Sequence, residues 1–119
     1  MSHTLVNLTR TLAGTALALT LGATPALASD EAQIQRGQDV FTAQKCQMCH
    51  AIAGKGNKMN PLDGVGKKLS LEDTKKWILS PIEMTAKVKS TKKPPMPAKY
   101  AKLPAADVDA LVAYVQSLK

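Results

Sequence analysis

Two thiols and an imidazole lie within one short segment of the sequence, Cys46-Gln47-Met48-Cys49-His50. Cysteines at positions i and i+3, with a histidine directly after the second, suit three kinds of chemistry: a disulfide redox pair, part of a zinc site, or a site of covalent haem attachment. In the last of these, the thiols add to the two vinyl groups of haem and the histidine becomes an axial ligand of the iron. The rest of the chain favours one of the three.

The first 28 residues resemble an export signal more than part of a folded domain. A segment with Arg10 and no acidic residue precedes an apolar stretch of small residues that ends in Ala26-Leu27-Ala28, the pattern of a signal peptidase site. Pro25 interrupts this stretch, which is shorter than the roughly 20 apolar residues of a membrane-spanning helix. We therefore expect a cleaved signal peptide (1–28), a single mature domain (29–119), a periplasmic location and no stable membrane insertion.

The zinc and redox-pair interpretations both conflict with the rest of the sequence. A structural zinc site needs four ligands, but the mature chain would keep Cys46, Cys49 and His50 and no other cysteine or histidine. A thioredoxin-like pair follows a strand and begins a helix within a βαβ unit, whereas this motif follows a predicted helix. Outside the cytosol, nearby thiols oxidise unless another reaction claims them. Haem attachment is therefore favoured, with one haem c as the expected cofactor.

Three helices are predicted for the mature chain. A capping-box pattern at Asp30 predicts a helix over about 31–44. Ser70 begins a second helix, which Pro81 ends because proline cannot continue the hydrogen-bond ladder. Pro104 suits the first turn of a last helix, whose apolar stripe has helical spacing. No run alternates with period two for long enough to predict a strand, so the expected fold class is all-α.

A loop is predicted over residues 53–68, which contain glycines, lysines and an Asn-Pro step without periodicity. Within this loop, Pro61 has a carbonyl oxygen that could accept a hydrogen bond from Nδ1 of His50. Such a bond would orient a metal-ligating imidazole. Pro61 is equally suited to a turn without this contact, and the residues alone leave both open.

A second axial ligand is expected from methionine, because haem iron in electron-transfer proteins commonly has His/Met ligation. Met48 lies between the cysteines and Met59 follows His50 closely, so neither is well placed to reach the opposite face of the ring. Met84 and Met96 both have enough sequence separation. Met96 is favoured because three neighbouring prolines stiffen its extended loop and lower the entropy cost of holding a weak iron–sulfur bond. Met84 fits better as a hydrophobic filler.

These features together resemble the small monohaem class I cytochromes c of bacteria over essentially the whole mature chain. The resemblance rests on the Cys46–His50 motif, "NPLDGVG" (60–66), "MPAKY" (96–100) and the last helix with "LVAYVQSL" (111–118). It implies a cytochrome c-like fold of three to four short helices around a covalently attached haem.

The resemblance also implies roles for individual residues. The carbonyl of Pro61 would hold His50, and Met96 would be the second iron ligand. The first and last helices would cross where Gly37 and Phe41 of the first contact Leu111 and Tyr114 of the last.

A haem iron with ligands on both faces has no open position, so we expect a one-electron carrier and not an enzyme. The chain has a net charge of +7, and lysines flank the Met96 loop. A basic ring around the haem edge would attract acidic redox proteins, as donor and acceptor, in transient contacts. The few aromatic residues offer little for stacking on nucleic acid, and a monomer is expected.

Two other functions remain open from the sequence. If Met96 is not a firm ligand, a five-coordinate haem would bind small gases or peroxide. The chain could also be the haem subunit of a larger oxidoreductase.

Overall fold

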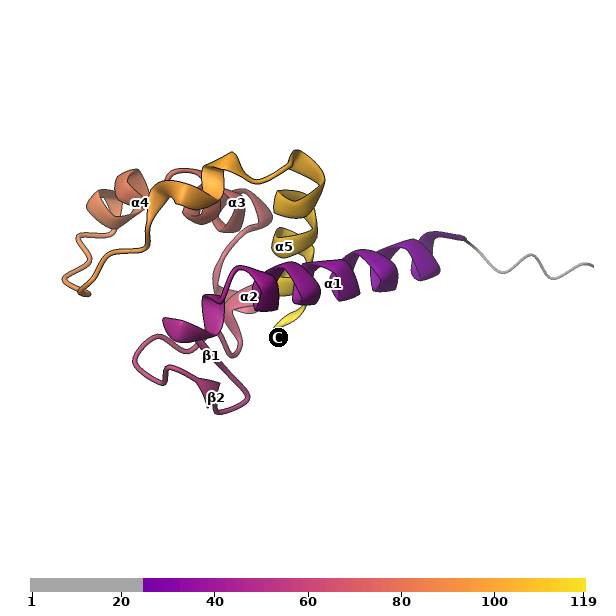
Figure 1. The fold of residues 1–119 in the computed structure, drawn as a ribbon, viewed down its shortest axis with the longest axis horizontal. Coiled ribbons are helices and arrows are strands. Elements are labelled where there is room, and N and C mark those ends of the chain that lie inside the picture. The colour runs from indigo at the N-terminus through magenta and orange to yellow at the C-terminus, as the bar shows by residue number, and fades with distance from the viewer. Residues whose placement is uncertain (1–24) are drawn as a thin grey trace, which may run out of the picture.

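The computed structural model describes residues 25–119. Helices dominate the chain, and one two-stranded hairpin interrupts them (Figure 1). In chain order the elements are α1 (Pro25–Ala43), the 3-10 helix η1 (Cys46–Met48), β1 (Ala51–Ile52), β2 (Lys55–Gly56), α2 (Val65–Lys68), α3 (Leu71–Leu79), α4 (Pro81–Lys87), the 3-10 helix η2 (Ala98–Lys102) and α5 (Ala105–Ser117).

The fold class is all-α, as expected, with five α-helices in the described residues where three to four were expected. Ser70 caps α3 through its hydroxyl, which accepts a hydrogen bond from the backbone N–H of Asp73 at 3.0 Å. Pro81 ends that helix and also begins α4, because proline fits the first position of a helix. The additional helices, α2 and α4, are short, and α2 lies in the segment expected to be a loop.

The start of α1 differs from the prediction. The helix begins at Pro25 and passes through Asp30 without a break, so Asp30 does not begin it in this chain. The residues between, Ala-Leu-Ala-Ser, include good helix formers that continue the helix backward. The signal peptide itself stays a prediction, and residues 1–24 lie outside the described residues.

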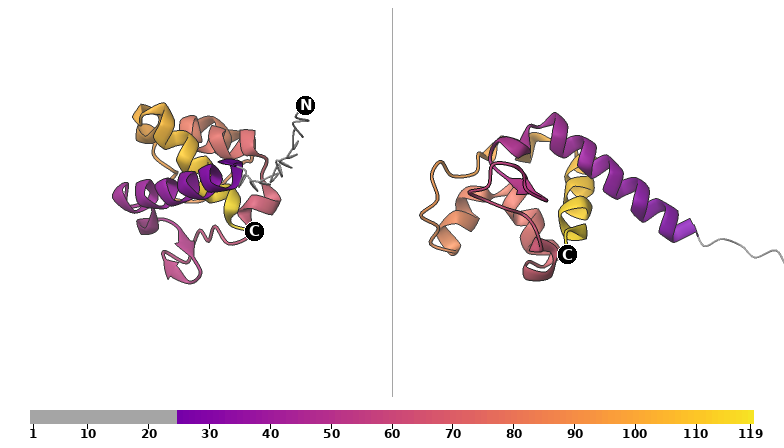
Figure 2. Two further views of the ribbon diagram at one scale, coloured as in Figure 1. Left: turned by 90° about the vertical axis from the view of Figure 1, so that its right-hand side faces the viewer. Right: turned by 90° about the horizontal axis from the view of Figure 1, so that it is seen from below.

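Helices α1 and α5 cross in close contact, as Figures 1 and 2 show. A Cβ atom at Gly37 would overlap the carbonyl of Ala110 and lie 2.6 Å from Cβ of Tyr114. One turn along α1, the rings of Phe41 and Tyr114 meet edge to face with centroids 5.6 Å apart. This crossing confirms the contact that the family resemblance implied, and Leu111 packs in the same core as Phe41.

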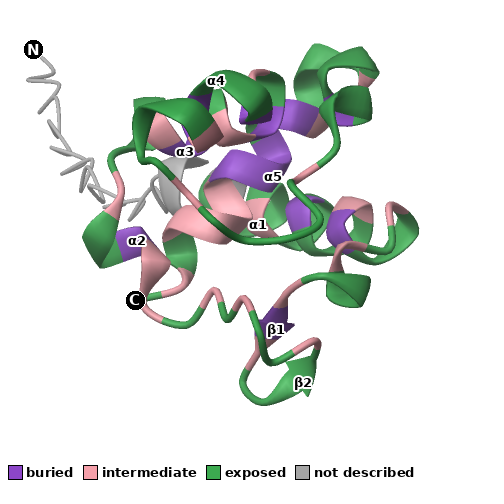
Figure 3. Cartoon of the chain, turned by 90° about the vertical axis from the view of Figure 1, so that its left-hand side faces the viewer, coloured by how far each residue is buried: buried purple, intermediate pink, exposed green. Residues whose placement is uncertain are grey.

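The hydrophobic core lies between α1, α3, η2 and α5. Purple, buried segments of α5 are at the centre in Figure 3, surrounded by the other helices. The buried cluster consists of Phe41, Ile78, Tyr100, Val108, Leu111 and Val112. The apolar residue at the start of α3, Leu71, is not part of this cluster and is 62% exposed.

The hairpin β1–β2 follows the Cys46–His50 segment directly. Ala51 pairs with Gly56 and Ile52 pairs with Lys55. The turn therefore consists of Ala53 and Gly54. Both have a positive φ, as in the tight turns that hairpins prefer. Gly56 also has a positive φ, and a Cβ atom there would overlap the carbonyl of His50. The hairpin therefore fixes the backbone next to His50.

Among residues 25–119, no helix is both long enough and apolar enough to cross a bilayer.

Candidate functional site

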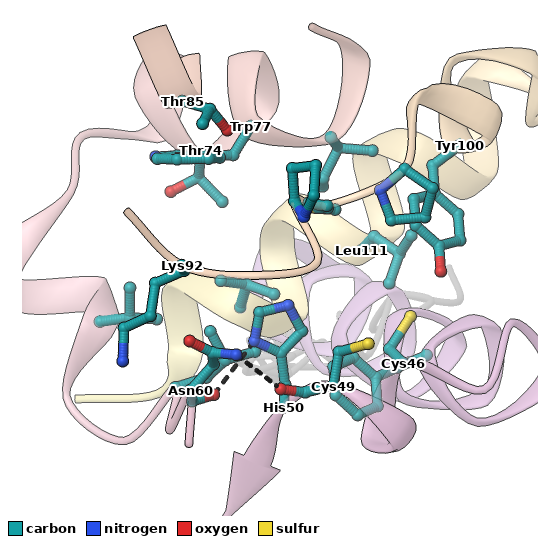
Figure 4. A pocket seen from close by; sticks show the side chains of 18 of the residues that line it. Cys46, Cys49, His50, Asn60, Thr74, Trp77, Thr85, Lys92, Tyr100 and Leu111 are labelled. Atoms are coloured by element: carbon teal, nitrogen blue, oxygen red, sulfur yellow. Dashed lines mark hydrogen bonds between the residues drawn. The ribbon is translucent and has the colours of Figure 1, made fainter. Parts of the chain in front are cut away.

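A cavity of about 250 Å³ opens between the Cys46–His50 segment, α3, α5 and the segment that connects α4 to η2 (Figure 4). Its walls are mostly apolar. Apolar side chains from several elements form them: Phe41, Leu62, Val65, Leu69, Trp77, Ile78, Leu111 and Val115. Such a lining suits a large flat hydrophobic group.

The two thiols and the imidazole all line this cavity. The chain leaves α1 through Lys45, which has a φ of 56°, and then winds through η1. The backbone N–H groups of Cys49 and His50 both donate to the carbonyl of Cys46, at 3.1 and 3.0 Å. This tight turn places both sulfur atoms beside the imidazole (Figure 4). Both cysteines are free.

The imidazole of His50 is held by a backbone carbonyl, as expected, but not by that of Pro61. Nδ1 lies 3.1 Å from the carbonyl oxygen of Asn60, the residue before it. Pro61 forms a parallel bridge with Ala51, in which Ala51 N–H donates to Asn60 and Leu62 N–H donates to Ala51. This pairing turns the carbonyl of Asn60 toward His50. Pro61 itself is exposed and does not line the cavity.

Burial lowers the pKa of His50, and the hydrogen bond to Asn60 opposes this shift in part. A lowered pKa favours the neutral imidazole at physiological pH, which is the form that binds a metal. With its proton on Nδ1 facing the Asn60 carbonyl, the ring keeps the lone pair of Nε2 for a ligand.

The thiol of Cys46 is half-buried, and burial raises its pKa to about 11, although the charge of nearby Lys99 opposes this. The side chain is therefore an uncharged thiol at neutral pH. An uncharged sulfur suits an apolar cavity wall better than a thiolate, because burying an unpaired charge is costly.

Of the four methionines in the described residues, Met96 alone lines the cavity. It lies in the segment between α4 and η2, on a different wall from His50. Met84 is only 3% exposed and belongs to the core side of α4, as expected for a filler. Met48 and Met59 are 67% and 65% exposed.

Sequence reasoning missed several polar residues of the cavity. Asn60 was overlooked in favour of its neighbour, although the same "NPLDGVG" segment indicated the region. Thr85, Ser90 and Lys92 also line the cavity. They follow no motif, and only the placement of α4 and the path of the chain from α4 to η2 bring them there.

The donor set of the cavity fits haem and does not fit zinc. Two thiols, a neutral imidazole and a thioether face an otherwise apolar space. Over residues 25–119 there is no group of three or more His, Cys, Asp or Glu side chains arranged to hold a metal ion. A cofactor that brings its own four equatorial ligands would need only axial and covalent contacts from this chain.

Comparison with known proteins agrees with this geometry. The family model described as Cytochrome c matches residues 34–119, which includes every residue placed on the cavity wall. No curated protein and no solved structure matches the chain.

Proposed function

The chain belongs to the cytochrome c family, whose members transfer electrons by means of covalently attached haem c, and we propose that it is an electron carrier with His50 and Met96 as axial ligands of the iron. One observation carries this proposal. Cys46, Cys49, His50 and Met96 line the same cavity, whereas the other three methionines of the described residues do not.

Each residue of the cavity has a distinct part in this function. Cys46 and Cys49 would hold haem through thioether bonds formed when their thiols add to its vinyl groups, and haem would supply an iron capable of one-electron redox chemistry. His50 offers Nε2 on one wall, because Asn60 holds Nδ1. Met96 offers its thioether from another wall. The apolar side chains exclude water, and a dry surrounding together with His/Met ligation tunes the reduction potential.

A carrier needs no open coordination position, and this separates it from the main alternative. If Met96 did not coordinate the iron, the cavity would accept a small gas or peroxide, and the chain would be a sensor or a peroxidase-like protein. The stiff backbone around Met96, with prolines at positions 94, 95 and 97, favours a fixed ligand. We therefore propose that the protein is not an enzyme.

Exposed lysines support docking with acidic redox proteins, both donor and acceptor. Eight of them belong to α2, α4, η2 and the segment around Met96: Lys67, Lys68, Lys87, Lys89, Lys92, Lys93, Lys99 and Lys102. Within the described part of the chain, Lys87 alone among these forms an ion pair, with Asp73 at 3.5 Å. Seven uncompensated charges would attract an acidic partner, and the contact would be transient.

We further propose that the protein is exported to the periplasm after cleavage following Ala28 and works there as a monomer. The leader-like composition of residues 1–28 supports export. The proposal includes no role in nucleic-acid binding and no stable membrane insertion.

Reversible redox chemistry without ligand binding is the test of this function. The purified holoprotein should be reduced and reoxidised by a one-electron mediator, and the reduced form should keep its visible spectrum when carbon monoxide is added. A spectrum that shifts rapidly with carbon monoxide would contradict the proposal and support gas or peroxide chemistry. Stable co-purification with a second subunit would instead indicate part of a larger oxidoreductase.

A further inference from the structure

We propose that Lys92 pairs with a propionate carboxylate of the bound haem and thereby raises the reduction potential; this inference rests on the proposed function. Lys92 lines the cavity, and its Nζ donates to the carbonyl oxygen of Met59 at 3.0 Å. The residue is otherwise exposed, so the ammonium group lies at the rim of the cavity.

The ammonium group of Lys92 has no acidic partner in the described part of the chain. Lys92 is the one lysine or arginine among the residues that line it, and no aspartate or glutamate of the described chain lines it. None of the ion pairs in residues 25–119 involves Lys92. A lysine at an apolar rim that contacts only a neutral carbonyl is suited to receive a negative charge from a ligand.

The attachment chemistry places such a charge on the side where Lys92 lies. The two propionates of haem are on the opposite side of the porphyrin from the two vinyl groups. Cys46 and Cys49 claim the vinyl side. In Figure 4, Lys92 lies on the other side of the His50 imidazole from both sulfur atoms. A haem attached at the two thiols would therefore direct its carboxylates toward the wall that carries Lys92.

Burial of a carboxylate in this cavity would be costly without a partner. A charged group that loses water needs a counter-charge or several hydrogen bonds. Lys92 provides three donors on a flexible stem. It can therefore keep the carbonyl of Met59 and accept a carboxylate as well.

The pairing has a consequence for the iron that can be measured. A positive charge near haem favours the reduced form, because oxidation adds positive charge to the iron. Lys92 also compensates the propionate charge, which would otherwise favour the oxidised form. Both effects act in the same direction, so removing the ammonium group lowers the reduction potential.

Redox titration of three holoprotein variants tests the inference. Lys92→Met removes the charge and keeps the stem, Lys92→Arg keeps a charge, and Lys93→Met removes the neighbouring exposed charge, which does not line the cavity. We expect Lys92→Met to change the reduction equilibrium constant by about threefold or more toward oxidation, or about 30 mV, since tenfold is 59 mV for one electron. Lys92→Arg should stay near the wild type, and Lys93→Met should shift by clearly less.

Equal shifts in Lys92→Met and Lys93→Met would overturn the inference, because a general loss of surface charge would then explain both. The inference would also be overturned if Lys92→Met kept the reduction potential of the wild type but had a lower free energy of unfolding. The lysine would then serve only as a hydrogen-bond donor to the carbonyl of Met59. In both of these outcomes the visible spectrum would still show His50 and Met96 as ligands of the iron. A failure of the inference about Lys92 is therefore distinguishable from a failure of the proposed function.

Discussion

Two features of its surroundings control the chemistry of His50. The carbonyl of Asn60 accepts the proton of Nδ1 and fixes the orientation of the imidazole. The apolar surroundings lower the pKa of His50 and keep the ring neutral. An imidazole held in this way would need little further ordering to bind a haem iron.

Two tyrosines give a pH dependence at the residue scale. Burial raises the pKa of Tyr100 and Tyr114, and at Tyr100 the thiols Cys46 and Cys49 add to the shift. In the haem-attached protein these sulfurs are uncharged thioethers, so burial alone remains. The folded pKa of each tyrosine exceeds the unfolded value of about 10. The contribution of the buried, neutral tyrosines to the free energy of unfolding is therefore fully present below about pH 10 and is lost as pH rises through the folded pKa.

Ultraviolet titration of phenolate formation checks this prediction. Both tyrosines of the folded holoprotein should ionise at higher pH than those of the denatured chain, and the variant Tyr114→Phe assigns the two steps. Identical titration curves for the folded and denatured protein would contradict it.

At the scale of elements, the crossing of α1 and α5 positions one wall of the cavity. Phe41 on α1, together with Leu111 and Val115 on α5, lines it. Gly37 allows the helices to approach this closely, because it brings no side chain against the backbone of Ala110. The contact between α1 and α5 also helps to position η1, which follows α1 and begins at Cys46.

Replacing Gly37 with alanine should therefore destabilise the protein. Alanine is the better helix former, but its methyl group would overlap the carbonyl of Ala110. We expect a net loss of about 1–3 kcal/mol in the free energy of unfolding, as for overpacked cores. Denaturant unfolding measures this, with Gln38→Ala on the exposed side of α1 as a control that should change by less than about 0.5 kcal/mol. A Gly37→Ala variant with a higher free energy of unfolding than the wild type would contradict the prediction, because α1 and α5 would then make room for the methyl group without loss of stability.

The longer elements were predictable from the sequence because local signals agree with the packing. Ser70 caps α3, Pro104 precedes α5, and the stripe with Val108, Leu111 and Val112 is buried as its spacing indicates. The sequence also indicates the Cys46–His50 motif and Met96, which line one cavity in the structure.

What the sequence did not indicate depends on contacts between distant segments. The bridge between Ala51 and Pro61 decides that the carbonyl of Asn60, and not that of Pro61, faces His50. The hairpin has strands of two residues, too short to show alternation. Lys92 reaches the cavity only because of the path from α4 to η2. None of these has a local pattern.

At the scale of the whole molecule, the positive charges are unevenly paired with acidic side chains. The basic residues near the Met96 loop are largely unpaired in the described chain, whereas Arg36 and Lys75, which contact α5, are matched by Asp107 and Asp109 at 2.7 Å. Positive charge is thus largely uncompensated near the Met96 loop and is paired where α1 and α3 meet α5. Such an asymmetry attracts anions to one side of the molecule.

A small anionic oxidant tests this charge placement without a natural partner. Oxidation of the reduced protein by ferricyanide should slow as ionic strength rises, because salt screens the attraction. Lys99, which lies 5.2 Å over the ring of Tyr100 at the cavity, should matter most. Lys99→Gln should lower the rate by about two- to tenfold at low salt.

The matched control, Gln33→Glu, changes the net charge by the same amount at an exposed position in the middle of α1 and should have little effect. Stopped-flow absorbance gives the rates, and equal effects of the two variants would contradict local steering.

The most direct measurement of the central claim concerns the sixth ligand. The absorption spectrum of the oxidised holoprotein is recorded into the far red, where iron–thioether coordination gives a charge-transfer band. The wild type is compared with two variants that keep the side-chain volume, Met96→Leu and Met84→Leu. We predict a band in the wild type and in Met84→Leu and none in Met96→Leu, because only Met96 lines the cavity with His50. A wild type without the band, or a band that disappears in Met84→Leu and persists in Met96→Leu, would contradict His50/Met96 ligation.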